Sequence, residues 1–157
     1  MERVPMTSRG AEALKETLNY LKGEKRHQIV STIEEARAHG DLSENAEYHA
    51  AKEEQGMNEA RVKDIEDKLA RAHVIDPATI TAEKIVFGAT VELIDLEEGT
   101  EITYQIVGVD EADIEAGKIS ITSPIARALI GKEEGDVAVV LAPGGEREYE
   151  IQAIEYV

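Results

Sequence analysis

The chain of 157 residues has no cysteine, no tryptophan, a single phenylalanine and only four prolines. Without cysteine, disulfide bonds and thiolate metal sites are both excluded. No run of eighteen or more apolar residues occurs, which excludes a membrane-spanning helix. The first ten residues, MERVPMTSRG, lack the apolar core of a signal peptide, so we expect a cytoplasmic protein of one or two small domains.

Positive charge is also scarce. The sequence has 17 Lys and Arg against 33 Asp and Glu, a formal net charge of −16. The imbalance is uneven, with −4 over residues 1–76 and −12 over residues 77–157. The second half would repel nucleic acid and suits a basic protein surface, whereas the first half is close enough to balance to touch a phosphate backbone locally.

The first half has helical periodicity. Between residues 7 and 38, apolar residues recur at steps of three, four or eight, which predicts one helix with Thr7 as its N-cap and Gly40 at C′. This apolar stripe consists of Leu14, Leu18, Leu21, Ile29, Ile33 and Ala36. A second helix is predicted from about residue 42 to 72, with Ala46, Ala50, Met57, Val62, Ile65, Leu69 and Ala72 on its apolar side.

Two helices of about 30 residues joined by about four must fold back on each other, which predicts an antiparallel coiled-coil hairpin. At 1.5 Å per residue the hairpin is about 45 Å long. Because a two-helix rod has little core, its far end gains almost nothing from packing. The obvious reason for such a length is that the rod carries its turn to a distant site.

From about residue 83 the periodicity changes to two, which predicts strands. We expect five, over residues 86–95, 100–108, 117–122, 136–142 and 147–157, with a tight turn at PGGE, residues 143–146. Ser123 as N-cap, Pro124 at N1 and Gly131 past the end predict a short helix between them. The sequence thus divides into a helical hairpin, residues 1–76, and an α+β domain, residues 77–157, with residues 77–82 as the linker.

The turn of the hairpin, residues 39–49, reads HGDLSENAEYH and has more charge than a turn needs. In one interpretation Asp41 is the N-cap of the second helix and Glu44 completes a capping box. In the other, the two carboxylates are ligands presented at the end of the rod. Two oxygens hold Mg²⁺ poorly alone, but they suffice where phosphates or another protein's carboxylates complete the coordination, as in two-metal phosphodiester hydrolysis.

Two further features of the turn leave alternatives open. His39 and His49 flank the acids and could bind Zn²⁺, but their spacing matches no zinc motif. Arg37 and Lys52 fall at similar heights of the hairpin, where they could hold a nucleic-acid phosphate. Alternatively, each forms a solvated ion pair with a nearby acid such as Glu34.

Several longer segments resemble the Gre family of bacterial transcript cleavage factors. The most specific is GDLSENAEYHAA at the turn, and PMTSRGAEALKETLNYLK, ISITSPIARALIGKEEGD and APGGEREYEI extend the likeness over essentially the whole chain. The resemblance implies an FKBP-like fold for the second domain. It also implies a monomer that binds RNA polymerase and is not an enzyme by itself.

By resemblance, the coiled coil enters the secondary channel of the polymerase and the globular domain docks at the channel rim. The tip acids, Asp41 and Glu44, then help the polymerase hold a second Mg²⁺ and a water, so that backtracked RNA is cut near its 3′ end. Arg37 and Lys52 would contact that RNA. The docking segment corresponds to Ser123, Pro124 and Ile125. No cofactor is expected on the isolated chain.

Lys52 stands where the family commonly has arginine, which keeps the charge but loses bidentate phosphate binding and favours short cleavage products. Three rival functions remain. A relative that inhibits from the same channel is disfavoured because both acids are present. A hairpin chaperone would expose apolar residues at its tip. A prolyl isomerase would need an aromatic pocket, and residues 77–157 have one Phe and no Trp.

Overall fold

The computed structural model describes residues 2–40 and 42–157. By their internal contacts they form two compact units: the N-terminal residues through Ala11 together with Ala72–Val157, and Glu12–Arg71. The sequence division at residue 76 stays a prediction. The first unit is a globular α+β domain and the second a helical hairpin, so the predicted fold class is confirmed.

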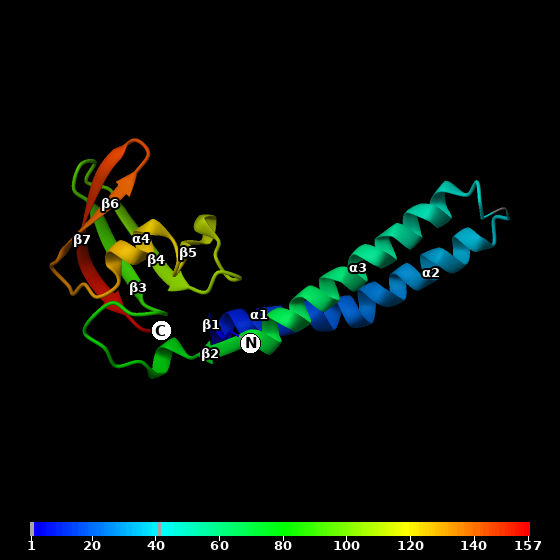
Figure 1. Cartoon of the computed structure of the whole chain (residues 1–157), viewed down its shortest axis with the longest axis horizontal. Helices are drawn as coiled ribbons and strands as arrows, with labels where there is room; N and C mark the ends of the chain where they lie inside the picture. The colour runs from blue at the N-terminus through cyan, green and yellow to red at the C-terminus, as the bar shows by residue number, and fades with distance from the viewer. Residues whose placement is uncertain (1, 41) are drawn as a thin grey trace. The chain divides into compact units, whose positions relative to one another are not determined.

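The hairpin unit is built from helical segments that run side by side up to the turn (Figure 1). In chain order they are α1 (Ser8–Tyr20), the π-helical turn η1 (Leu21–Lys25), α2 (Arg26–Arg37) and α3 (Ala46–Arg71). At the predicted N-cap, Thr7 Oγ1 accepts a hydrogen bond of 3.1 Å from the amide of Gly10. None of the described helices combines the length and hydropathy that crossing a bilayer requires.

The π-helical turn explains an irregular step in the first helix. Leu21 and Ile29 are both buried although they are eight residues apart, one more than the seven of a heptad. A π-helix has a wider turn than an α-helix and takes up one extra residue. Leu21–Lys25 is therefore the place where the seam of the first helix returns to the same face.

The second helix buries a different residue from the one predicted. Met57, predicted on the apolar side, is 64% exposed, and the adjacent Asn58 is 5% exposed. The seam alternates steps of four and three residues, passing through Ala51, Gln55, Asn58, Val62, Ile65 and Leu69, and the same spacing leads to Ala72, just past the end of the helix. The prediction was wrong for Met57 and Ala50, which lie one residue off this repeat, and for Ala46, which lies two residues off it; all three are exposed.

The two sides of the hairpin are joined by one buried hydrogen bond and several ion pairs. Asn58 Nδ2 donates to the carbonyl oxygen of Leu21, in the π-helical turn, at 3.0 Å. Arg26 forms a bidentate pair with Glu59, both contacts at 2.8 Å. Lys25 Nζ lies 2.7 Å from Glu54, whose hydrogen bond and charge raise the pKa of that lysine. These contacts fix the register between the helices.

The globular unit contains a five-stranded mixed sheet in the order β5-β4-β3-β7-β6. The elements are β3 (Thr90–Asp95), β4 (Glu101–Val107), η3 (Ile114–Ala116), β5 (Lys118–Ser120), α4 (Pro124–Leu129), β6 (Val137–Ala142) and β7 (Gly145–Glu155). Within this sheet β4 and β5 pair in parallel, and the other neighbouring strands are antiparallel. All five predicted strands and the helix are confirmed; the first four strands are shorter than predicted, and β7 begins and ends two residues earlier.

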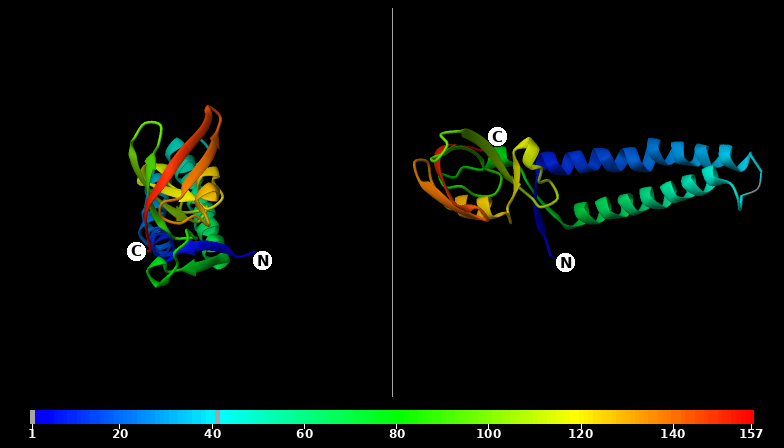
Figure 2. Two further views of the ribbon diagram at one scale, coloured as in Figure 1. Left: turned by 90° about the vertical axis from the view of Figure 1, so that its left-hand side faces the viewer. Right: turned by 90° about the horizontal axis from the view of Figure 1, so that it is seen from above.

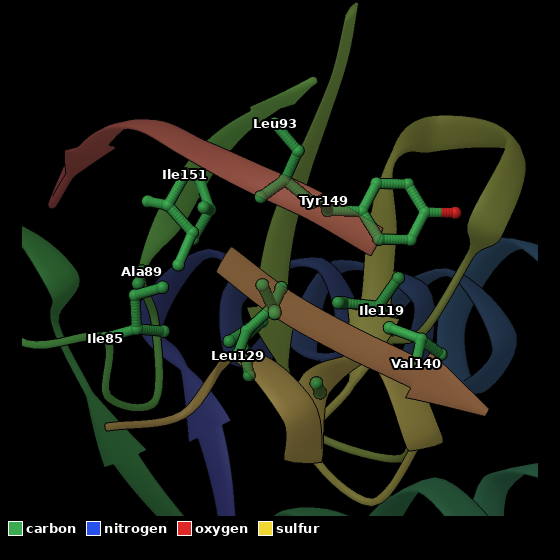
Figure 3. Close-up of a cluster of buried hydrophobic side chains, with 12 residues drawn as sticks. Ile85, Ala89, Leu93, Ile119, Leu129, Val140, Tyr149 and Ile151 are labelled. Atoms are coloured by element: carbon green, nitrogen blue, oxygen red, sulfur yellow. The ribbon is translucent and has the colours of Figure 1, made fainter. Parts of the chain in front are cut away.

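The core lies between one face of this sheet and α4. In Figure 3, Ile85, Leu129 and Ile151 point toward one another from a loop, a helix and a strand. Ser123 caps α4 as predicted, since its Oγ accepts from the amide of Ala126 at 3.3 Å. The helix thereby holds Ala126 and Leu129 against the sheet, where neither exposes any surface.

The sequence did not predict a second, two-stranded sheet in the globular unit. Strand β1 (Val4–Thr7) pairs in parallel with β2 (Ala72–Ile75), and η2 (Pro77–Thr79) follows. The carboxylate of Glu111 accepts hydrogen bonds from the amides of Thr7, at 3.0 Å, and Gly108, at 2.7 Å, and from the Thr7 hydroxyl. This carboxylate fastens the N-terminal strand to the loop after β4.

Candidate functional site at the turn of the hairpin

The turn begins where α2 ends, at Arg37 (Figure 2). Ala38 is the C-cap, and the amide of His39 donates to the carbonyl oxygen of Ala36 at 3.2 Å. Gly40 has φ +110°, a conformation that favours glycine. The prediction that Gly40 occupies C′ was wrong by one position, because the helix ends one residue earlier than expected.

Asn45 closes the turn at the start of α3. Its Oδ1 accepts from the amide of Tyr48 at 3.0 Å, the bond expected of an N-cap, and its Nδ2 donates to the carbonyl oxygen of Ala36 at 2.6 Å. One side chain therefore caps the second helix and holds the end of the first. Asn45 was not predicted, although asparagine directly before a helical repeat is a recognisable cap signal.

The capping-box interpretation of the acids is contradicted by this geometry. The helix begins at Ala46, so a cap at Asp41 with Glu44 at N3 would fall before its first turn. Asp41 itself lies outside the described residues. Glu44 is exposed and forms no hydrogen bond or ion pair with any residue that the structure describes. Its carboxylate is thus available to a ligand from outside the chain.

The two histidines do not gather into a metal site with the described acids. His49 Nε2 lies 3.2 Å from the carbonyl oxygen of Ser43, and its ring meets that of Tyr48 edge-on at a centroid distance of 5.6 Å. Within residues 2–40 and 42–157, no three His, Cys, Asp or Glu side chains are placed to hold an ion. Among the described residues of the turn, Glu44 therefore offers an isolated hard oxygen donor group and not part of a metal cluster.

The two basic residues lie on opposite sides of the turn. Arg37 is in the last turn of α2, and Lys52 is in the second turn of α3. Both are exposed. Lys52 Nζ donates to Gln55 Oε1 at 3.1 Å. Gln55 carries no charge, so this bond leaves the charge of Lys52 available to a phosphate.

The proposed docking segment lies on the globular unit, at the start of α4. Ser123 Oγ donates to the carbonyl oxygen of Ser120 at 2.7 Å while it caps the helix. Pro124 is exposed and Ile125 is half-buried against the core. The Ser123 side chain therefore ties the segment to backbone groups on both sides of it, and Pro124 presents an apolar ring to solvent.

Comparison with known proteins covers both units. The family model described as "Transcription elongation factor, N-terminal" matches residues 4–74, and that described as "Transcription elongation factor, GreA/GreB, C-term" matches residues 80–156. The chain is 63% identical over 157 residues to the transcription elongation factor GreA of Ralstonia nicotianae, with 99% of each covered. It is 61% identical over 158 residues to that of Methylococcus capsulatus, with 100% of each covered.

A solved structure, GreA factor homolog 1 (Gfh1) of Thermus thermophilus, is 31% identical and covers 98% of this chain and 99% of its own, with a TM-score of 0.44. The matches to the two family models and to full-length relatives agree with each other. The chain therefore belongs to the GreA/GreB family of transcription elongation factors.

Proposed function

We propose that this transcription elongation factor binds bacterial RNA polymerase and stimulates the polymerase's own cleavage of backtracked RNA. The hairpin enters the secondary channel, and Asp41 and Glu44 meet the catalytic centre there. The polymerase holds the first metal and the substrate, so the factor alone is not an enzyme. Arrested complexes resume elongation once a new RNA 3′ end lies in register.

The observation that carries this proposal is the unused carboxylate of Glu44. Asn45 performs the capping that the acids would otherwise explain, which leaves Glu44 exposed without a described partner. A lone carboxylate is a poor Mg²⁺ site, but it is a good additional ligand where phosphates supply the rest. A second Mg²⁺ would stabilise the charge that develops during phosphodiester hydrolysis, and Asp41 and Glu44 would hold it and orient a water.

The remaining contacts follow from charge and exposure. Arg37 and Lys52 would hold a phosphate of the extruded RNA, since both side chains are exposed near the turn. The globular unit would dock on a basic rim of the polymerase through Ser123, Pro124 and Ile125. The excess of acid over base in residues 77–157 supports such a partner and opposes direct binding of nucleic acid by this unit.

The test uses halted, backtracked polymerase complexes with 3′-labelled RNA. Wild-type chain with Mg²⁺ should release short labelled fragments, and Glu44→Ala or Asp41→Ala should release none while both still bind polymerase. Glu47→Ala is the matched control, because Glu47 is an exposed acid in the first turn of α3. Normal cleavage by Glu44→Ala would contradict the proposal.

The same variants separate catalysis from folding. Asn45→Ala should lower the free energy of unfolding by about 1 kcal/mol, the usual cost of a lost N-cap, whereas Glu44→Ala should leave it unchanged. Urea denaturation followed by circular dichroism measures both. An inhibitory role from the same channel would appear instead as polymerase binding without fragments from the wild type.

A further inference from the structure

Strand β6, at one edge of the five-stranded sheet, presents an apolar row to solvent. Val137, Val139 and Leu141 are 41%, 46% and 72% exposed, whereas Ala138 and Val140 between them are buried. Natural edge strands usually interrupt such rows with charge or proline, because an open edge invites pairing with another chain. This row has neither interruption.

A row of carboxylates lies next to the apolar row, on strand β7, which runs alongside β6 (Figure 1). Residues directly opposite each other in an antiparallel pair share a face of the sheet. The opposed pairs are Val137 with Glu150, Val139 with Glu148, and Leu141 with Glu146. We call these six residues the β6 edge surface. Its apolar row is outermost, and its acidic row lies one strand spacing, about 4.8 Å, further in.

The backbone of β6 is also available at this edge. The amide of Ile151 donates to the carbonyl oxygen of Asp136 at 2.9 Å, which directs the Asp136 carbonyl toward β7. Because backbone polar groups alternate between the two sides of a strand, those of Val137, Val139 and Leu141 are directed to the open edge. An added strand would satisfy them.

The opposite face of the same strands is already occupied. Ala138 and Val140 pack with Ala126 and Leu129 of α4 in the core. The β6 edge surface is therefore the solvent side of a strand whose other side is fixed. Its geometry does not depend on a loop, so a partner would meet a preformed site.

We propose that the β6 edge surface binds an extended protein segment with lysine or arginine at alternate positions, which adds to the sheet as a sixth strand. Such a strand would lie one spacing from the apolar row and about 10 Å from the carboxylates. Long cationic side chains match both rows, since their methylene stems cover the valines and their charged ends reach the glutamates. This site is separate from the polymerase function proposed above.

Charge argues for a basic partner over a second copy of the chain. Two copies paired through β6 would place apolar row beside apolar row, but each carries a net charge of −16. The repulsion between them opposes association at low ionic strength. A basic segment gains from the same acidic row.

The first measurement titrates the ¹⁵N-labelled full chain with a capped nine-residue peptide of alternating lysine and valine. We expect chemical-shift changes and slowed amide exchange at Val137, Val139 and Leu141. A peptide of the same composition with all lysines at one end should bind about tenfold more weakly, because it loses the alternating contacts. Replacing each lysine with diaminopropionic acid, which keeps the charge on a shorter stem, should weaken binding similarly.

Variants of the chain test the same surface. Val139→Lys should abolish binding of the alternating peptide, and Glu148→Gln should weaken it, while Glu115→Gln should not. Glu115 is the matched control because it is an exposed acid outside the β6 edge surface. Should Val139→Lys disturb the amide spectrum of the core, the comparison of Glu148→Gln with Glu115→Gln still tests the surface.

Three results would overturn the proposal. Equal affinity for the alternating and the block peptide would mean general attraction to an acidic protein. Equal weakening of peptide binding by Glu115→Gln and Glu148→Gln would also mean that the attraction to an acidic protein is general. A dimer in sedimentation that Val139→Lys dissociates would assign the edge to a second copy of the chain.

Discussion

At the scale of single residues, Asp95 is a buried acid that its surroundings hold in the ionised form. The residue is 1% exposed, and its Oδ1 accepts from the amides of Glu97, at 2.9 Å, and Glu98, at 3.2 Å. Arg147 Nη1 lies 3.0 Å from Oδ2. The amide of Glu97 is the largest cause that lowers the pKa of Asp95, and the amide of Glu98 and the charge of Arg147 lower it further.

This lowered pKa predicts a pH dependence of stability. An aspartate in the unfolded chain has a pKa of about 3.9, so the folded state binds a proton less readily than the unfolded state. The stabilisation from Asp95 is complete above about pH 4 and is lost as pH falls through the folded pKa. We therefore expect Asp95→Asn to be less stable than wild type at pH 7, and the difference to shrink below pH 4.

Urea denaturation at several pH values measures this difference. Asp113→Asn is the control, because Asp113 is an exposed aspartate of the same domain. Asparagine keeps the oxygen that the two amides need, so the substitution removes charge more than hydrogen bonding. A stability difference that does not change between pH 7 and pH 3 would show that the ionised form is not what Asp95 contributes.

At the scale of elements, the unexpected feature of α3 is that its seam contains a polar residue and excludes an apolar one. Asn58 donates to the carbonyl oxygen of Leu21 across the hairpin, while Met57 points to solvent. A single buried asparagine in a coiled coil sets the register of the helices. The partner carbonyl belongs to the π-helical turn, so the same bond marks where the first helix takes up its extra residue.

Alanine substitutions of Asn58 and Met57 should change the free energy of unfolding in the opposite order to the one that hydropathy predicts. Asn58→Ala should lower the free energy of unfolding by roughly 1–2 kcal/mol, because it removes a buried hydrogen bond and leaves space in the seam. Met57→Ala should change it by less than about 0.5 kcal/mol, as exposed substitutions usually do. Thermal unfolding of the two variants compares them directly, and the reverse order would show that α3 is rotated.

The elements themselves could be predicted from the sequence because their signals are local. Periodicity identified the five strands, and the Ser123-Pro124 pair identified the start of α4. The phase of α3 could not be predicted, since Met57 and Asn58 differ by one position and only the partner helix decides between them. The cap was missed because Asp41 and Asn45 are both good N-caps, and the choice depends on the contact of Asn45 with Ala36 across the turn.

At the scale of the whole molecule, the globular unit combines two segments that are far apart in the sequence. β1 pairs with a strand 68 residues later, and Glu111 binds Thr7 across 104 residues. No local pattern predicts such a parallel pair of four residues, which is why the sequence placed β1 with the hairpin. The backbones approach closely here, since a Cβ on Gly108 would clash with the carbonyl oxygen of Pro5.

Loss of the Glu111 side chain should most weaken the junction between β1 and the loop after β4. Glu111→Ala leaves the buried Thr7 hydroxyl and amide and the amide of Gly108 without their acceptor, which should cost roughly 2–4 kcal/mol of unfolding free energy. Glu115→Ala, at an exposed acid four residues on, should cost less than about 0.5 kcal/mol. Urea denaturation monitored by amide signals of β1 and β2 measures both, and equal small effects would contradict the junction.

The discontinuity of the globular unit sets an order of events during synthesis. β1 leaves the ribosome before the intervening helices, so it finds its partner strand only after they have emerged, and Thr7 waits longer still for Glu111. The helices contact mainly each other, so they can pair while the nascent chain is still growing. β7, the last of the five strands along the sequence, lies between β3 and β6 in the interior of the sheet, so the sheet closes only after β7 has been translated.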